Sequence, residues 1–223
     1  MCGIVGYIGS NPAAPFLLDG MSKLEYRGYD SAGIAVLEKG QVRVEKCVGR
    51  LDALRQKLEG HRPEGVMGIG HTRWATHGRP ADRNSHPHTD GSGKFVVVHN
   101  GIIENYLALK EELIAKGVEF TSDTDTEVVA HLMADLFDGD MESTVKKVLK
   151  VIKGSYSLVF MCEAEQDKII CTKKDNPLVI GLGEGENFIA SDIPAIINHT
   201  RRTFIMSDGE IATVTKDGVW VQD

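Results

Sequence analysis

Apolar runs of strand length occupy both ends of this chain and enclose a block of helical patterns. Short apolar or alternating runs bounded by Gly, Pro and polar turns predict strands. They cover 2–9, 31–38, 41–48, 66–75 and 94–100, and most of the chain after 155. Helices are expected at 12–26, 50–59, 104–116, 126–137, 141–152 and, briefly, 192–198. Because strands and helices are partly segregated, we predict an α+β layered sandwich.

Local signals support several of these boundaries. Lys39-Gly40 joins two adjacent strands. Gly117 follows the helix at 104–116 in the C′ position, which favours glycine. Thr124-Asp125-Thr126-Glu127 has the T-x-x-E capping-box pattern and is expected to open the next helix. The polar segment between residues 75 and 94 contains His and Pro but no apolar pattern, so it is expected to be a loop without a core.

Length and charge restrict the class of protein. The 223 residues fit one globular domain, which we take to span 1–223. A net charge of -7 argues against a surface for nucleic acid, so the expected partner is a small molecule. The first basic residue is Lys23, and no apolar run approaches about 18 residues. We therefore expect no secretory signal and no membrane association, and predict a cytoplasmic protein.

The four cysteines are irregularly spaced and predict no disulfide framework. Cys47, Cys162 and Cys171 lie in strand-like runs and are predicted to be buried thiols. Cys2 differs, because removal of Met1 would leave a thiol and a free α-amine on one residue. The amine titrates at about 7.7–8.0 and a thiol near about 8.5, so the amine can accept the thiol proton. A cysteine that merely follows the initiator Met is the alternative, and this residue alone leaves both open.

The strand at 66–75 runs into a polar motif, His71-Thr72-Arg73-Trp74-Ala75-Thr76-His77-Gly78. An arginine at a strand end can bind a carboxylate through two parallel hydrogen bonds, which a lysine cannot reproduce. The adjacent Trp74 can cover a small ligand. A surface loop with one half-buried tryptophan would have the same sequence, so this motif alone does not decide between them.

Two further motifs can each be interpreted in a structural and in a functional way. Asn100-Gly101 follows an apolar strand and is typical of a type I′ hairpin turn. The same pair could form an oxyanion hole, with the Asn100 amide and the Gly101 backbone N–H as donors. Asp125 could cap the helix that follows it, bind a ligand ammonium, or do both.

Five histidines between 71 and 99 raise the possibility of a metal site. No H-E-x-x-H or Cys-His spacing accompanies them, so no metal is expected. Gly181-Leu182-Gly183-Glu184-Gly185 has glycines spaced as in a phosphate-binding loop. It follows a strand, but no clear helical pattern begins after it, so a tight turn is predicted.

Taken together, these segments resemble the class II, N-terminal nucleophile glutamine amidotransferases. The similarity is most specific to the glutaminase domains of the glucosamine-6-phosphate synthase (glutamine:fructose-6-phosphate aminotransferase) family. It rests on six segments distributed over nearly the whole chain: MCGIVGYIG, LEYRGYDSAGIAV, HTRWATHG, HNGIIEN, SDTDTEVVAHL and PLVIGLGEGENFIASD. CGIVG alone would also fit the phosphoribosyl-pyrophosphate amidotransferases, asparagine synthetases and glutamate synthases.

The resemblance implies a four-layer αββα sandwich of the N-terminal nucleophile hydrolase type, hydrolysing L-glutamine through a Cys2 thioester. Roles then follow motif by motif, and no cofactor is implied. Arg73 would bind the substrate α-carboxylate and Asp125 the α-ammonium, with Thr76 and His77 completing the pocket. Trp74 would lie on a mobile loop that closes over glutamine. The remaining roles are an oxyanion hole from Asn100 and Gly101, and orientation of residue 2 by Arg27 and Gly28.

In the whole family enzyme, two C-terminal sugar-isomerase domains receive the ammonia and aminate fructose-6-phosphate. We expect this chain to be the glutaminase fragment of such an enzyme, with homo-oligomers only at full length. Two other functions stay open at this stage. One is an N-terminal nucleophile hydrolase acting on a different amide, and the other is a non-catalytic regulatory or metal-binding module.

Overall fold

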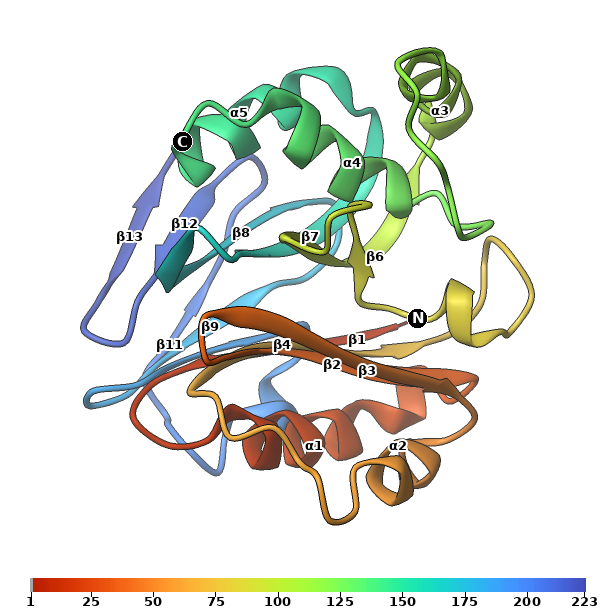
Figure 1. Ribbon diagram of the computed structural model, residues 1–223. Coiled ribbons are helices and arrows are strands. Elements are labelled where there is room, and N and C mark those ends of the chain that lie inside the picture. The colour runs from red at the N-terminus through yellow and green to blue at the C-terminus, as the bar shows by residue number, and fades with distance from the viewer. Residues whose placement is uncertain (1) are drawn as a thin grey trace.

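The computed structural model describes residues 2–223 and places two antiparallel sheets face to face, with helices on both outer sides (Figure 1). The first sheet has seven strands, in the spatial order β11 (Thr203–Ile205), β9 (Val179–Leu182), β10 (Asn187–Ala190), β1 (Gly3–Ile8), β4 (Met67–Arg73), β2 (Ser31–Glu38) and β3 (Gln41–Val48). The second has six, in the order β13 (Val219–Gln222), β12 (Ile211–Val214), β8 (Glu165–Lys174), β7 (Gly154–Cys162), β6 (Phe95–Ile103) and β5 (His88–Thr89).

Helices form the two outer layers. α1 (Ala13–Leu24) and α2 (Leu51–Lys57) lie on the first sheet, and α4 (Glu127–Leu136) and α5 (Met141–Val151) lie on the second (Figure 1). α3 (Tyr106–Ala115) packs beside α4, and short 3₁₀ turns occur at η1 (Glu25–Arg27), η2 (Asp82–Asn84) and η3 (Ile193–Ala195). The predicted four-layer αββα sandwich is confirmed.

Three apolar clusters hold the layers together. Leu17 and Met21 of α1 face the first sheet, and the corresponding cluster under α4 and α5 includes Val128 and Val145. A third cluster fills the space between the sheets, where Ile69 of β4 is fully buried. Alternation along the strands separates these faces, since Ile4 points between the sheets and Val5 toward α1. Each fully buried side chain of this kind stabilises the fold by roughly 1.5–3 kcal/mol.

Two glycines in β4 let α1 approach the sheet closely. A Cβ at Gly68 would lie 2.9 Å from Cδ1 of Leu17, and one at Gly70 would lie 3.1 Å from Sδ of Met21. Ile69 between them points to the opposite face. The Gly-Ile-Gly sequence thus fits a strand with a helix packed tightly on one side and a second sheet on the other.

Most of the predicted elements form within one to three residues of the expected bounds, and Gly117 is at its predicted C′ position with φ of 90°. Three predictions were wrong or incomplete in detail. The helix expected at 192–198 is only the 3₁₀ turn η3. The strand at 94–100 continues as β6 to Ile103. Cys162 and Cys171 are buried as predicted, whereas Cys47 is only partly buried.

The predicted capping box before α4 is not formed, so this prediction was also wrong. The N-cap residue is Thr126, in helical conformation and without a side-chain cap hydrogen bond, so neither Thr124 nor Asp125 caps this helix. Glu127 instead accepts hydrogen bonds from the backbone N–H groups of Thr121 and Ser122. Its buried carboxylate therefore organises the segment that precedes the helix. Burial raises the pKa of Glu127, but the contact with His131 at 3.5 Å and the hydrogen bonds from Ser122 and Thr121 outweigh this effect and hold the pKa well below the usual range.

The polar segment between β4 and β6 is not a coreless surface loop, because Asn84, Ser85, His86 and His88 are all buried. Asn84 accepts a hydrogen bond from the Asp123 N–H at 2.8 Å and donates to the Arg79 carbonyl at 3.0 Å. Buried polar groups are tolerated when hydrogen bonds satisfy them, and here one partner, Asp123, comes from a segment that is distant in sequence. An apolar pattern is therefore not needed for this segment to be buried.

Four histidines form a neutral buried layer in this region. The rings of His71 and His86 stack with centroids 4.1 Å apart, and His86 meets His88 edge-on at 4.6 Å. Burial lowers the pKa of His71 to about 3 and holds those of His86, His88 and His99 below the ordinary value. Within residues 2–223, no group of three or more His, Cys, Asp or Glu side chains is arranged to hold a metal ion.

The helices described for this chain include none with the length and apolarity to cross a membrane.

We expect the free energy of unfolding to fall as pH decreases below about 6.5. Histidines that are neutral when folded bind protons after unfolding, so the unfolded state gains protons first and acid destabilises the fold. Each such histidine removes about 1.4 kcal/mol per pH unit below about 6.5, and for His71 the loss ends near its folded pKa of about 3. Urea unfolding at several pH values between about 7 and 5 measures this slope.

A matched pair of variants assigns the slope to the buried rings. His88→Gln should reduce the pH dependence by the contribution of one histidine, whereas His61→Gln, at an exposed position, should leave it unchanged. A stability that is flat between pH about 6.5 and 5 would contradict the neutral, buried state of these side chains.

Candidate active site

A cleft of about 410 Å³ opens where the first residues of the chain meet the ends of β4 and β6. Every residue predicted for the site lines it except Gly28: Cys2, Arg27, Arg73, Trp74, Thr76, His77, Asn100, Gly101 and Asp125. These residues come from β4 and β6, from η1, and from the segments before β1, after β4 and before α4. The fold therefore brings together residues that are up to 123 positions apart.

Cys2 lies directly before β1, and its thiol is held by the backbone of Trp74. Its Sγ accepts a hydrogen bond from the Trp74 N–H at 3.2 Å and lies 3.4 Å from the Trp74 carbonyl oxygen. Burial raises the pKa of the Cys2 thiol, although the Trp74 hydrogen bond and the Arg73 charge oppose this. The thiol is thus protonated at neutral pH and needs a base before it can act as a nucleophile. Met1 and its predicted removal lie outside the residues described.

Asn100 and Gly101 do not form a hairpin turn. β6 continues through them, with Asn100 opposite Ser157 and Gly101 opposite Tyr156 on β7. The Asn100 amide Nδ2 donates to the Cys2 carbonyl at 3.1 Å, which joins the two sheets at the cleft. Gly101 has φ of 126°, and a Cβ there would lie 2.1 Å from the Ser155 carbonyl oxygen, so only glycine fits.

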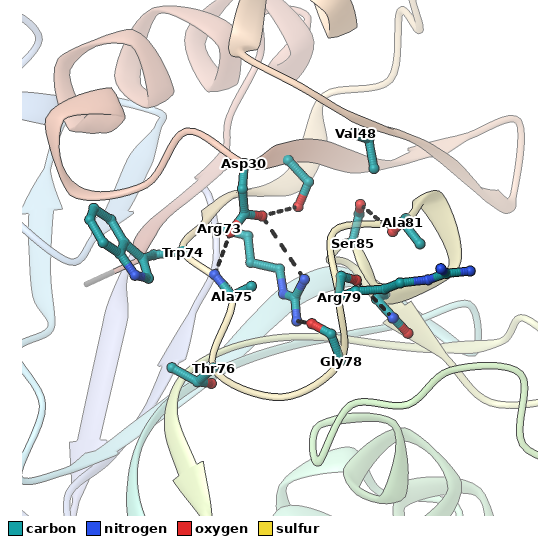
Figure 2. Close-up of polar contacts among 12 residues, drawn as sticks. Asp30, Val48, Arg73, Trp74, Ala75, Thr76, Gly78, Arg79, Ala81 and Ser85 are labelled. Atoms are coloured by element: carbon teal, nitrogen blue, oxygen red, sulfur yellow. Dashed lines mark hydrogen bonds and ion pairs between the residues drawn. The ribbon is translucent and has the colours of Figure 1, made fainter.

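Arg73 is the last residue of β4 and is almost completely buried. Its Nη2 donates to the carbonyl groups of His77 and of Gly78, the latter at 3.1 Å. Its Nη1 lies 3.9 Å from Asp30 Oδ1 and has no hydrogen-bond acceptor among residues 2–223. Figure 2 shows the side chain extended between Asp30 and Gly78. The guanidinium is thus fixed by Asp30 and two carbonyl groups, and it places a buried positive charge at the lining of the cleft.

Asp125 supplies a buried negative charge across the same cleft. Its Oδ2 accepts the Ile103 N–H at 2.8 Å and lies 4.0 Å from His99 Nδ1. Burial lowers the pKa of His99, so this ring is neutral and does not compensate the carboxylate. Buried charges are stable when paired, so the cleft offers a place for a cation beside Asp125.

Arg27 lines the cleft together with Cys2, and Gly28 lies against the end of β4. Arg27 is buried and donates from Nη1 to the Ser191 carbonyl and to Asp192 Oδ2, each at 3.2 Å. A Cβ at Gly28 would lie 2.8 Å from the carbonyl carbon of Arg73, although its backbone is extended with φ of -166°. The close approach of the chain to the end of β4 therefore leaves no room for a side chain at Gly28, and this residue does not line the cleft.

The segment after Arg73 forms the rim. The Trp74 ring is 48% exposed and contacts the Tyr29 ring edge-on, with centroids 5.3 Å apart. Thr76 Oγ1 lies 3.3 Å from His77 Nδ1, and the His77 ring meets Tyr106 of α3. A large, half-exposed aromatic side chain thus lines the cleft, and its backbone contacts the thiol.

Sequence reasoning missed Asp30, which positions the Arg73 segment. Its carboxylate accepts hydrogen bonds from the Ala75 N–H and from the Ser31 hydroxyl, and it faces the Arg73 guanidinium (Figure 2). Asp30 lies within the Arg-Gly-Tyr-Asp-Ser segment of the resemblance, which was the available signal. Its role could not be read from spacing, because Arg73 and Ala75 lie more than forty residues away in the sequence.

The central part of the chain, residues 71–198, matches the glutamine amidotransferase domain family. Among curated relatives, the glutamine--fructose-6-phosphate aminotransferase (isomerizing) of Caldanaerobacter subterraneus subsp. tengcongensis is 56% identical over 98% of this chain. Proteins of the same name from Aquifex aeolicus and Thermus thermophilus are 53% and 50% identical over 98% and 100% of it. The chain spans only 36% to 37% of the length of these relatives.

Solved structures show the same architecture. Glutamine phosphoribosylpyrophosphate amidotransferase from B. subtilis superposes with a TM-score of 0.86 at 27% identity, covering 99% of this chain and 49% of that one. An allosteric regulatory enzyme of purine biosynthesis gives a TM-score of 0.87 at 27% identity, covering 99% and 48%. Together with the match over more than half of its length, these similarities show that the chain belongs to the glutamine amidotransferase domain family and has the N-terminal nucleophile fold of such enzymes.

Proposed function

We propose that this chain hydrolyses the side-chain amide of L-glutamine to glutamate and ammonia, with the Cys2 thiol as nucleophile. The observation that carries the proposal is the cleft itself, in which one thiol lies beside a fixed cation, Arg73, and a buried anion, Asp125. An α-amino acid has a carboxylate and an ammonium that match this pair. Its side chain can then extend toward Cys2.

The proposed base is the α-amine of Cys2, exposed by removal of Met1. The amine takes the thiol proton, and the sulfur attacks the amide carbon. The resulting oxyanion is stabilised by the Asn100 amide and the Gly101 N–H. The C–N bond then breaks, the nitrogen leaves as ammonia with the proton from the amine, and a thioester remains. Water, deprotonated by the same amine, hydrolyses the thioester to glutamate and restores the thiol.

The other residues bind and orient in this proposal. Arg73 holds the substrate α-carboxylate and Asp125 the α-ammonium, while Thr76 and His77 complete the pocket. Trp74 closes over bound glutamine, and its exposed position at the rim supports this. Arg27 and Gly28 orient the N-terminal residue.

We further propose that residues 1–223 are one glutaminase domain of a longer, cytoplasmic protein that forms any homo-oligomer at full length. The relatives carry the name glutamine--fructose-6-phosphate aminotransferase (isomerizing). Amination of fructose 6-phosphate to glucosamine 6-phosphate, a step of hexosamine biosynthesis, would then use the ammonia released here. The sugar site would belong to C-terminal sugar-isomerase domains.

The first test concerns the base. Protein with Met1 removed, confirmed by mass, should release glutamate from glutamine, whereas protein with an N-terminal extension should lose about 10²–10⁴-fold in kcat, because an amide nitrogen cannot accept the thiol proton. Cys2→Ala should be inactive and folded. Equal activity of the free and extended forms would exclude the amine as base, and a preference for another amide in a substrate panel would exclude glutamine.

The second test concerns substrate binding. Arg73→Lys should raise KM, with a loss of about 2–3 kcal/mol in kcat/KM, because a point charge replaces a guanidinium fixed by Asp30 and two carbonyls. Glutamate release over a range of glutamine concentrations measures this. Arg43→Lys at a surface salt bridge to Glu38 serves as the control. An unchanged KM in Arg73→Lys would place the carboxylate site elsewhere.

The third test concerns the acceptor. The 223-residue chain, given glutamine and fructose 6-phosphate, should release ammonia and form no amino sugar, whereas the longer protein should form glucosamine 6-phosphate. Chromatographic assay of the sugar phosphate distinguishes the two. Amino-sugar formation by the chain alone would refute the division of labour proposed here.

A further inference from the structure

A buried histidine lies directly behind the Asn100 amide. His71 belongs to β4, is 0% exposed, and does not line the cleft. Its Nε2 lies 3.0 Å from Asn100 Oδ1 and 3.0 Å from the carbonyl oxygen of His99. The first sheet thus contacts, through one ring nitrogen, the residue proposed to stabilise the oxyanion on the second.

The hydrogen-bond partners determine which atoms carry hydrogen. The Cys2 carbonyl can only accept, so the Asn100 group 3.1 Å from it is the NH₂, and the oxygen of that amide faces His71. Both atoms near His71 Nε2 are therefore acceptors, and Nε2 must be the donor. The Nδ1 of His71 has no hydrogen-bond partner among residues 2–223, which fits an unprotonated nitrogen.

The ring has little freedom to change this arrangement. Burial keeps the pKa of His71 at about 3, so the ring remains neutral and has a single N–H at physiological pH. His86 stacks on it with an interplanar angle of 17°, and the Nδ1 of His86 lies 3.4 Å from the His99 N–H. The plane of the His71 ring is thus set by His86, which accepts a hydrogen bond from the backbone of His99, the residue whose carbonyl His71 contacts.

We propose that His71 is a positioning residue whose Nε2–H locks the Asn100 amide with its NH₂ toward Cys2 and the cleft. One N–H of that group donates to the Cys2 carbonyl, and the other is available to the oxyanion. A flipped amide would place Oδ1 against the Cys2 carbonyl and beside the developing negative charge, which is repulsive at both contacts. This inference rests on the proposed function of Asn100 and adds the residue that orients it.

Kinetics of a double-mutant cycle test the inference. His71→Leu should lower kcat about 10- to 100-fold and leave KM nearly unchanged. This loss is smaller than the about 10²–10³-fold that removal of one oxyanion donor costs, because the misoriented Asn100 remains present. Because His71 acts through Asn100, His71→Leu combined with Asn100→Ala should be no slower than Asn100→Ala alone. Losses that multiply in the double variant would overturn the proposal.

Two further variants separate positioning from general stability. His71→Gln, whose amide NH₂ can donate from nearly the same place, should recover most of kcat. Cys171→Ala removes a fully buried side chain from the same inter-sheet core without a contact to Asn100, and should lower the urea midpoint but not kcat. A His71→Gln variant as slow as His71→Leu would refute the hydrogen-bond role.

A measurement without substrate keeps this inference distinct from the proposed function. Long-range ¹H–¹⁵N correlation spectra of the histidine rings report which nitrogen carries hydrogen. We expect His71 to be the Nε2–H tautomer in the Met1-free protein. An Nδ1–H tautomer of His71 would overturn the inference even in an active enzyme. An Nε2–H tautomer in a protein that does not hydrolyse glutamine would show that only the proposed function has failed.

Discussion

The antiparallel pairing of β1 with β4 fixes the position of the thiol. Gly3 lies opposite Thr72, so Cys2 is beside the end of β4, where the backbone of Trp74 contacts its sulfur. A shift of one residue in this register would exchange the two faces of β1 and move Ile4 out of the inter-sheet core. The burial of Ile4 on one face and Val5 on the other therefore also holds the Cys2 thiol in place, although neither residue lines the cleft.

The second sheet contributes its part of the site across a polar interface. Asn100 of β6 reaches Cys2, and His71 of β4 reaches Asn100, so the sheets are joined at the cleft by hydrogen bonds where apolar contacts dominate elsewhere. Buried polar groups destabilise a fold unless they are paired. Neutral histidines suit this place, because each offers one donor and one acceptor without the desolvation cost of a charge.

The sequence predicted the elements well because periodicity is a local property. The α1 face, the β2–β3 hairpin and the Gly117 C′ position all depend on residues within a few positions of one another. Resemblance supplied the site residues, and the structure brings nine of the ten to one cleft. The failures have more than one cause. Asn84 is buried through a hydrogen bond to the distant Asp123, and β6 continues through Asn100-Gly101 because it pairs there with β7. Glu127 instead binds Thr121 and Ser122, which are close in sequence but precede the helix, so its side chain does not complete a capping box.

Two carboxylates, Asp30 and Glu127, do not line the cleft but position groups that do. Asp30 faces Arg73 and holds the Ala75 N–H, and Glu127 holds the backbone just before Asp125. The two charges proposed to bind the amino acid are thus each positioned by an acidic residue that lies one step further out. If either support were replaced by an apolar residue, the binding residue would keep its identity but lose its fixed geometry. The proposed specificity for an α-amino acid would therefore depend on four residues and on the two chain segments that they order.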